Sequence, residues 1–209
     1  VAGDGVNRVI GGSGSDTITT GDGDSTIFGD HGSFTYTDTG ILTKVISILE
    51  DQGAADTITS GDGNNLIIAG QGGDEVNVGI GGNIVLGDGG TAVFAADGTR
   101  SSIETGDADQ GGDDTISIAG GNNVVLGGLS SNDAGDIIIT GAGSDLVLGD
   151  HGLVRYASGV LTSVASTDVG QGGKDTVNTG EGTNTVIGGF GPDSLTSGAG
   201  ADILTGDNA

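Results

Sequence analysis

Aliphatic residues recur along this chain at a spacing of nine residues. Each follows an Asp, Asn or Ser by two positions and, in most units, a Gly by four, as in the stretch GGSGSDTIT at residues 11–19. Fifteen units fit the pattern Gly-Gly-x-Gly-x-Asp-x-U-x, in which U is aliphatic. Because Gly readily adopts a positive φ, each unit predicts a turn followed by a short strand that places one side chain in a core.

The two informative positions of the unit are filled in all fifteen copies. The aliphatic eighth positions are Val9, Ile18, Ile27, Ile58, Ile67, Val76, Val85, Ile116, Val125, Ile138, Val147, Val177, Val186, Leu195 and Leu204. The polar sixth positions are Asn7, Asp16, Ser25, Asp56, Asn65, Asp74, Asn83, Asp114, Asn123, Asp136, Asp145, Asp175, Asn184, Asp193 and Asp202. One turn and one strand make half a coil, so the pattern predicts an all-β fold, a parallel β-roll or β-solenoid of nonapeptide half-turns.

A second repeat of about 59 residues is superimposed on the first. A Gly-Asp pair marks it at Asp30, Asp88, Asp150 and Asp207, at steps of 58, 62 and 57 residues. Each of the first three pairs opens an excursion from the nine-residue pattern, near residues 30–52, 88–110 and 150–171. We interpret residues 1–209 as a single solenoid that these excursions interrupt, with length changes in the excursions and in the stretch 128–136.

The excursions alternate apolar and polar residues on both sides of a Gly, which predicts β-hairpins at residues 33–48, 91–103 and 153–166. Four of the six aromatic rings lie in them: Phe34, Tyr36, Phe94 and Tyr156. We expect these rings to pack the hairpins onto the flank of the solenoid. On this interpretation, deleting residues 33–48 leaves a folded roll.

The sixth positions differ between the two edges that alternate units predict. One edge has Asp in all seven units: Asp16, Asp56, Asp74, Asp114, Asp136, Asp175 and Asp193. The other edge has Asp in only two of eight units, Asp145 and Asp202, and Asn or Ser elsewhere. The pattern therefore predicts a carboxylate ladder at one edge and a largely metal-free amide ladder at the other.

Composition narrows the chemistry. The chain has 47 Gly, no Cys, Met or Trp, two His and a formal net charge of -24. These numbers argue for a thin aliphatic core, against disulfides and an ordinary zinc site, and against binding to nucleic acid. No apolar run is long enough for membrane insertion, and no signal peptide is visible. The chain starts at Val1, which we interpret as a processed or excised piece of a longer protein.

Stacked carboxylates repel one another unless a cation lies between them, and Ca²⁺ is the natural ion because it accepts carboxylate and backbone oxygens in loose geometry. We therefore predict calcium ligands among the sixth-position aspartates of both edges, and a second set of contacts from the Gly-Asp motif. The first set is Asp16, Asp56, Asp74, Asp114, Asp136, Asp175, Asp193, Asp145 and Asp202. The second set is Asp30, Asp88, Asp150 and Asp207.

The units resemble the hemolysin-type calcium-binding nonapeptide, also called the repeats-in-toxin or RTX family. The best copies are GGSGSDTIT (11–19), AGQGGDEVN (69–77), TGAGSDLVL (140–148), GGFGPDSLT (188–196) and SGAGADILT (197–205). The resemblance implies a parallel β-roll with Ca²⁺ at the turns and type I secretion to the extracellular space. The hairpin interruptions are similar to repeats of very large bacterial surface proteins.

The favoured function is structural: a calcium-stabilised repeat segment of an extracellular adhesin, surface layer or filament, with end-to-end self-association into fibres. Two alternatives remain open. One is a calcium-dependent export and folding module of a secreted enzyme or toxin, and the other is an ice- or polysaccharide-binding face built on Thr17, Thr19, Thr57 and Thr59. No nucleophile, base and orienting group occur at credible spacing, so an enzyme is not expected. His31 and His151 are not expected to function, because Gly89 fills the same motif position.

Overall fold

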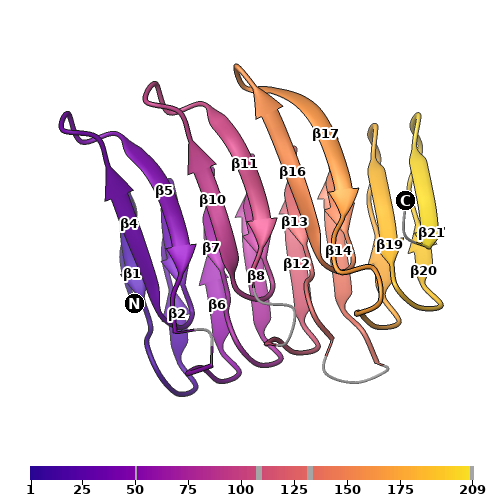
Figure 1. Ribbon diagram of the computed structural model, residues 1–209. Coiled ribbons are helices and arrows are strands. Elements are labelled where there is room, and N and C mark those ends of the chain that lie inside the picture. Colours follow the sequence, from indigo (N-terminus) through magenta and orange to yellow (C-terminus); the bar gives the residue numbers. More distant parts are fainter. Residues whose placement is uncertain (50, 107–109, 131–133, 208–209) are drawn as a thin grey trace.

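The computed structural model describes residues 1–49, 51–106, 110–130 and 134–207. All regular structure in these residues is β-strand, arranged in three sheets (Figure 1). Two parallel sheets face each other and form a β-roll, and the third sheet consists of antiparallel hairpins. The predicted parallel β-solenoid with hairpin excursions is confirmed.

The first parallel sheet has eight strands, and we call it the covered sheet because the hairpins lie over its outer face. In the order of the stack its strands are β1 (Asn7–Ile10), β3 (Ser25–Phe28), β7 (Leu66–Ile68), β9 (Ile84–Leu86), β13 (Val124–Leu126), β15 (Leu146–Leu148), β19 (Thr185–Gly189) and β21 (Ile203–Asp207).

The second parallel sheet has seven strands, and we call it the open sheet because its outer face meets solvent. Its strands are β2 (Thr17–Thr19), β6 (Thr57–Ser60), β8 (Glu75–Ile80), β12 (Thr115–Gly120), β14 (Ile137–Ala142), β18 (Thr176–Asn178) and β20 (Ser194–Thr196). The chain alternates between the two sheets, so each nine-residue unit adds one strand. In the register, equivalent positions of the units lie side by side, as Ile18 does with Ile58.

The eighth-position side chains fill the space between the two parallel sheets. The buried cluster there is entirely aliphatic and includes Ile18, Ile27, Ile58, Ile67, Val76, Val85, Ile116, Val125, Ile138, Val147, Val177 and Val186, with Val9 and Leu195 packed against it. Leu204 on the outermost strand is the exception, since it is 40% exposed. The predicted thin aliphatic core is therefore present.

A second core lies between the covered sheet and the hairpin sheet, and the sequence analysis did not predict it. The four central strands of the covered sheet, β7, β9, β13 and β15, carry apolar residues on both sides of the eighth position, and all three residues of each are buried. Their outer side chains pack with Val45, Ala92, Ile103 and Val154 of the hairpins. The hairpins are consequently part of a core. From this packing we expect residues 33–48 to contribute to folding, contrary to the expectation from the sequence.

The hairpin sheet lies in the three excursions, as predicted. Its order is β17 (Val160–Ser166), β16 (Gly152–Ala157), β11 (Arg100–Thr105), β10 (Gly90–Phe94), β5 (Leu42–Ser47) and β4 (Gly32–Tyr36). Three of the four excursion rings, Phe34, Phe94 and Tyr156, pack against the second core as expected, and the ring centroids of Phe28 and Phe34 are 5.3 Å apart. Tyr36 does not, since it is 45% exposed. Residue 50, residues 107–109 of the second excursion, 131–133 of the stretch 128–136, and the terminal 208–209 lie outside the described residues.

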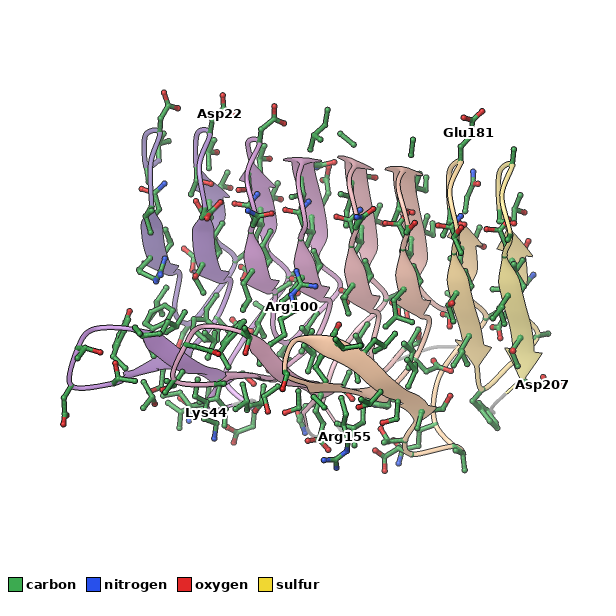
Figure 2. The ribbon with its side chains drawn as sticks, turned by 90° about the horizontal axis from the view of Figure 1, so that it is seen from above. Asp22, Lys44, Arg100, Arg155, Glu181 and Asp207 are labelled. Atoms are coloured by element: carbon green, nitrogen blue, oxygen red, sulfur yellow. The ribbon has the colours of Figure 1, made fainter. Side chains whose placement is uncertain are left out.

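The turns at the two edges of the roll differ in the number of residues that they contain as well as in sequence. We call the turns from the covered sheet to the open sheet the carboxylate edge, and the turns back to the covered sheet the amide edge. At the amide edge successive sixth positions are always nine residues apart, whereas at the carboxylate edge the interval from Ser25 to Asp56 contains a whole hairpin. Figure 2 shows Asp22 and Glu181 at tips of the amide edge, while the hairpins cross the opposite half of the molecule.

Glycines make the turn possible. In the first turn of the carboxylate edge Gly12 and Gly14 have φ of 105° and 90°, in the left-handed region that side chains rarely adopt. The turn therefore places Asp16 directly before β2, at the N-terminal end of this strand of the open sheet. The same placement recurs in every coil and generates the candidate site.

Candidate calcium-binding edge

The seven sixth-position aspartates of the carboxylate edge form one continuous ladder. The backbone N–H of Asp16 donates to Oδ1 of Asp56 at 2.7 Å, and that of Asp56 donates to Oδ1 of Asp74 at 2.7 Å. The same bond continues through Asp114, Asp136 and Asp175 to Asp193, with distances of 2.7 to 3.0 Å. Each carboxylate is thus fixed by the coil before it, and the predicted ladder is present.

The second oxygen of every ladder aspartate is buried and accepts no hydrogen bond from the described residues. The atoms concerned are Oδ2 of Asp16, Asp56, Asp74, Asp114, Asp136, Asp175 and Asp193. The five inner residues of the ladder are at most 3% exposed. A buried anionic oxygen without a donor is costly, and seven in one column require positive charge from outside the protein chain.

The titration behaviour of the ladder leads to the same conclusion. Burial raises the pKa of Asp74 from 3.8 to about 8, that of Asp175 to about 7 and that of Asp56 to about 6. Burial, and then repulsion by neighbouring carboxylates, also raises the pKa of Asp114 and Asp136 well above 3.8. At neutral pH the protein alone therefore cannot keep this ladder ionised without a large energetic cost.

The geometry around the free oxygens fits a cation with oxygen ligands. A Cβ added to Gly29 would lie 2.2 Å from Oδ2 of Asp56 and 2.3 Å from the carbonyl oxygen of Ala69. A Cβ on Gly149 would lie 2.1 Å from Oδ2 of Asp175 and 2.3 Å from the carbonyl oxygen of Gly188. Glycine keeps this position clear while a carboxylate and a carbonyl oxygen converge on it, and both are ligand types that Ca²⁺ prefers.

No group of three or more His, Cys, Asp or Glu side chains is placed to hold a metal within the described ranges. A cation at this edge would accordingly take a ladder carboxylate together with backbone carbonyls of the turns. This is a ligand set for a hard cation with flexible coordination, which favours Ca²⁺ over Zn²⁺ and Mg²⁺.

The Gly-Asp residues that open the excursions act as clasps. Asp88 is 2% exposed and accepts the backbone N–H groups of Gly112, 24 residues later, and Leu129, 41 residues later. Asp30 binds Ala54 and Gln71 in the same way, and Asp150 binds Gly173 and Phe190. Each clasp joins the start of an excursion to its end and to the next coil. Asp207, on β21, is exposed. A direct calcium contact from these four residues stays a prediction.

The amide edge forms a ladder of the same shape from different atoms. The backbone N–H of Asn65 donates to Oδ1 of Asn83 at 3.0 Å, and that of Asn83 donates to Oδ1 of Asn123 at 3.2 Å. The structure places Asp145 and Asp202 in this ladder, where they accept the backbone N–H groups of Asn123 and Asn184. The predicted sorting of the two edges is confirmed, and a calcium role for Asp145 and Asp202 stays a prediction.

The histidines have hydrogen-bonding partners that give them structural roles. Nε2 of His31 lies 2.9 Å from Oγ of Ser13, and Nδ1 of the buried His151 lies 3.1 Å from Oγ1 of Thr105. The sequence analysis missed the two-sided clasp because its partners are backbone groups far along the chain. It expected backbone oxygens at the calcium sites but did not identify which carbonyls converge there, such as those of Ala69 and Gly188.

The fold and this edge define a calcium-binding β-roll built from repeats. A family model for the RTX calcium-binding nonapeptide repeat matches four copies, at residues 1–33, 52–85, 169–186 and 178–208, which together span just over half of the chain. The chain belongs to this family, and its repeats bind Ca²⁺. Comparison with curated proteins and with solved structures gives no match. The family is a structural calcium-binding repeat and not a catalytic one.

Proposed function

We propose that this chain is a calcium-stiffened structural segment of an extracellular bacterial surface protein such as an adhesin, a surface layer or a filament. The observation that carries the proposal is the uninterrupted column of seven aspartates whose Oδ2 atoms lack donors. The column runs from β2 to β20, so calcium bound along it would join all seven coils into one rod.

The proposed ligands are the ladder residues Asp16, Asp56, Asp74, Asp114, Asp136, Asp175 and Asp193. Calcium sites of extracellular modules have Kd values of about 10⁻⁴ to 10⁻³ M, so each adds about 1 to 2 kcal/mol in millimolar calcium. Several sites together exceed the roughly 5 kcal/mol that separates a stable domain from a marginal one. In a cytosol with sub-micromolar calcium the same contribution is close to zero, which supports folding after export.

An extracellular location is consistent with the family, whose members are typically secreted. The described part of the chain contains no helix that could cross a membrane. The proposal also includes end-to-end self-association. The outer strands β1, β2, β20 and β21 each pair on one side only, and apolar residues such as Ile10 and Ile203 are exposed there. Unpaired strand edges favour pairing with another coil.

The alternative function as an export and folding module of a secreted enzyme or toxin uses the same calcium chemistry. What favours the structural function is the continuous stack of parallel strands. An ice- or polysaccharide-binding face is less well supported. The outward row that starts with Thr17 and Thr57 continues through Glu75 and Ile137, so the threonines do not form a regular array.

Electron microscopy and small-angle scattering of the purified chain test the proposal. The two conditions are about 5 mM Ca²⁺, which suits calcium sites of extracellular modules, and excess EDTA. A structural segment gives stiff rods or filaments in calcium that disappear in EDTA. Compact monomers in calcium would favour the export module, and rods that persist unchanged in EDTA would contradict a stiffening role for calcium.

A further inference from the structure

The amide edge contains protein donors at the place where the carboxylate edge has unpartnered oxygens. Nδ2 of Asn65 lies 3.1 Å from the carbonyl oxygen of Gly61 and 3.2 Å from that of Gly63, both in its own turn. Nδ2 of Asn184 likewise lies 3.1 Å from the carbonyl oxygen of Gly180. An amide N–H therefore occupies the carbonyl cluster that would otherwise attract a cation.

Two aspartates replace Asn in the amide ladder, at positions 145 and 202, but neither has an oxygen without a hydrogen-bond partner. Oγ1 of Thr140 donates to Oδ2 of Asp145 at 2.7 Å, and Oγ of Ser197 donates to Oδ2 of Asp202 at 3.0 Å. Both hydroxyls lie five residues before the aspartate that they bind. Oδ1 of each aspartate accepts N–H groups from the preceding Asn, including its Nδ2, at 2.8 Å for Asp145 and 3.0 Å for Asp202.

We propose that side-chain donors close the amide edge without calcium, and that the hydroxyls of Thr140 and Ser197 determine that Asp145 and Asp202 bind none. The inference rests on calcium binding at the carboxylate edge, which it limits to that edge. It distinguishes two kinds of sixth-position aspartate in one repeat family: those with an unpartnered Oδ2, which need a cation, and those with a hydroxyl donor, which do not.

At the amide edge, the residue five positions before the sixth position differs between coils, which allows the rule to be tested. Val78 precedes Asn83 and Ile118 precedes Asn123, so an Asp at either place would find no hydroxyl. Thr179 precedes Asn184, and its Oγ1 is buried without a hydrogen-bond partner in the described residues. An Asp at position 184 would therefore find a donor at the spacing seen for Thr140 and Asp145, which provides a matched pair of test sites.

The first experiment counts calcium by equilibrium dialysis of the full chain in millimolar Ca²⁺. The double variant Asp145→Asn/Asp202→Asn should bind as many ions as the wild-type chain, with affinity changed less than about twofold, a difference below 0.5 kcal/mol. Asp114→Asn/Asp136→Asn should bind fewer. A loss of ions in Asp145→Asn/Asp202→Asn overturns the inference, whereas no loss in Asp114→Asn/Asp136→Asn overturns the proposed calcium ladder itself.

The second experiment creates or removes the donor. Asn83→Asp should gain one bound calcium, because Val78, five residues earlier, offers no hydroxyl. Asn184→Asp should gain none, because Thr179, five residues earlier, offers one. Thr140→Val removes the donor of Asp145 and should also add one ion. Equal stoichiometry in Asn83→Asp and Asn184→Asp would contradict the rule. If Asn83→Asp does not fold, Thr140→Val and the Asp145→Asn/Asp202→Asn count still decide the question.

Discussion

The carboxylate edge and the amide edge use the same nine-residue turn but stabilise the stacked coils differently. At the amide edge Nδ2 of Asn65 hydrogen-bonds to its own turn and to Oδ1 of Asn83, so the ladder is complete within the protein. At the carboxylate edge Oδ2 of Asp74 has no donor among the described residues, and the ladder is incomplete without a cation. We therefore expect an edge to depend on calcium where a carboxylate without a hydroxyl donor replaces the amide in each coil.

All three hairpins are inserted at the carboxylate edge. Amide hydrogen bonds have narrow geometric requirements, and every step at the amide edge is nine residues long. Calcium accepts oxygens in loose geometry, and the clasp residues Asp30, Asp88 and Asp150 close each excursion with backbone hydrogen bonds. The carboxylate edge therefore tolerates insertions that the amide edge does not contain.

Removing one excursion should lower the stability of the folded chain more than any other change to either edge. Deleting residues 33–48 and joining the ends with a short Gly linker exposes the outer face of the covered sheet near the buried Phe28. Each large apolar side chain that becomes exposed costs about 1.5 to 3 kcal/mol, so the thermal unfolding transition should be lost or shifted strongly downward even in calcium. A wild-type melting temperature by circular dichroism would show that the hairpin only decorates the roll.

Breaking a clasp should have the next largest effect. Asp88→Ala leaves the buried N–H of Gly112 and the half-buried N–H of Leu129 without an acceptor, at up to about 1 to 3 kcal/mol each. The matched control is Asp62→Ala at the amide edge, where an exposed carboxylate accepts the N–H of Ile80. We expect Asp62→Ala to change the free energy of unfolding by less than about 1 kcal/mol. Similar losses of unfolding free energy in the two variants, measured by chemical denaturation, would mean that burial of the clasp does not add to its stabilising effect.

Removing one ladder carboxylate should have a smaller effect that depends on calcium. Asp74→Asn should weaken calcium binding and lower stability by about 1 to 2 kcal/mol in millimolar Ca²⁺, the contribution of one site. Asn65→Ala should reduce stability through its lost hydrogen bonds but leave calcium affinity nearly unchanged. Titration calorimetry separates the two, and equal losses of affinity would contradict the assignment of calcium to one edge.

Protonation should replace calcium to a limited extent. The pKa of Asp74 is about 8 and that of Asp175 about 7 in the folded chain, against 3.8 for an unperturbed carboxyl. Between about pH 4 and pH 8 the folded state therefore binds more protons than the unfolded state, and the free energy of unfolding falls as the pH rises. In EDTA the chain should accordingly show more β signal near pH 5 than at pH 8. An equal signal at both pH values would indicate that ladder repulsion does not limit folding.

The sequence predicted the roll and the two edges because one position per unit carries each signal. The eighth position indicates the core, and the sixth position separates Asp from Asn between the two edges. The second core was also encoded, since Leu66 and Ile68 flank Ile67 where Thr57 and Thr59 flank Ile58, but only the central residue was interpreted. The unused signal was the contrast between the flanking positions of alternate units.

The donors of Asp145 and the partners of the clasps could not be read in the same way. Thr140 contacts Asp145 because the turn between them folds back. The repeat pattern does not indicate that the side chain five residues before a sixth-position aspartate lies close to it. The backbone N–H of Leu129 belongs to a coil 41 residues after Asp88. Such contacts depend on the stacking of coils and on insertion lengths, which only the three-dimensional arrangement reveals.

The central claim is that cations at the carboxylate edge are required for folding, and circular dichroism during a calcium titration tests it most directly. In excess EDTA at pH 7 to 8 we expect the chain to be largely coil, because 24 net negative charges and an incomplete ladder oppose compaction. As Ca²⁺ rises toward millimolar, the β signal should increase cooperatively, with Mg²⁺ a poor substitute. A chain that keeps its full β signal in EDTA would contradict the claim.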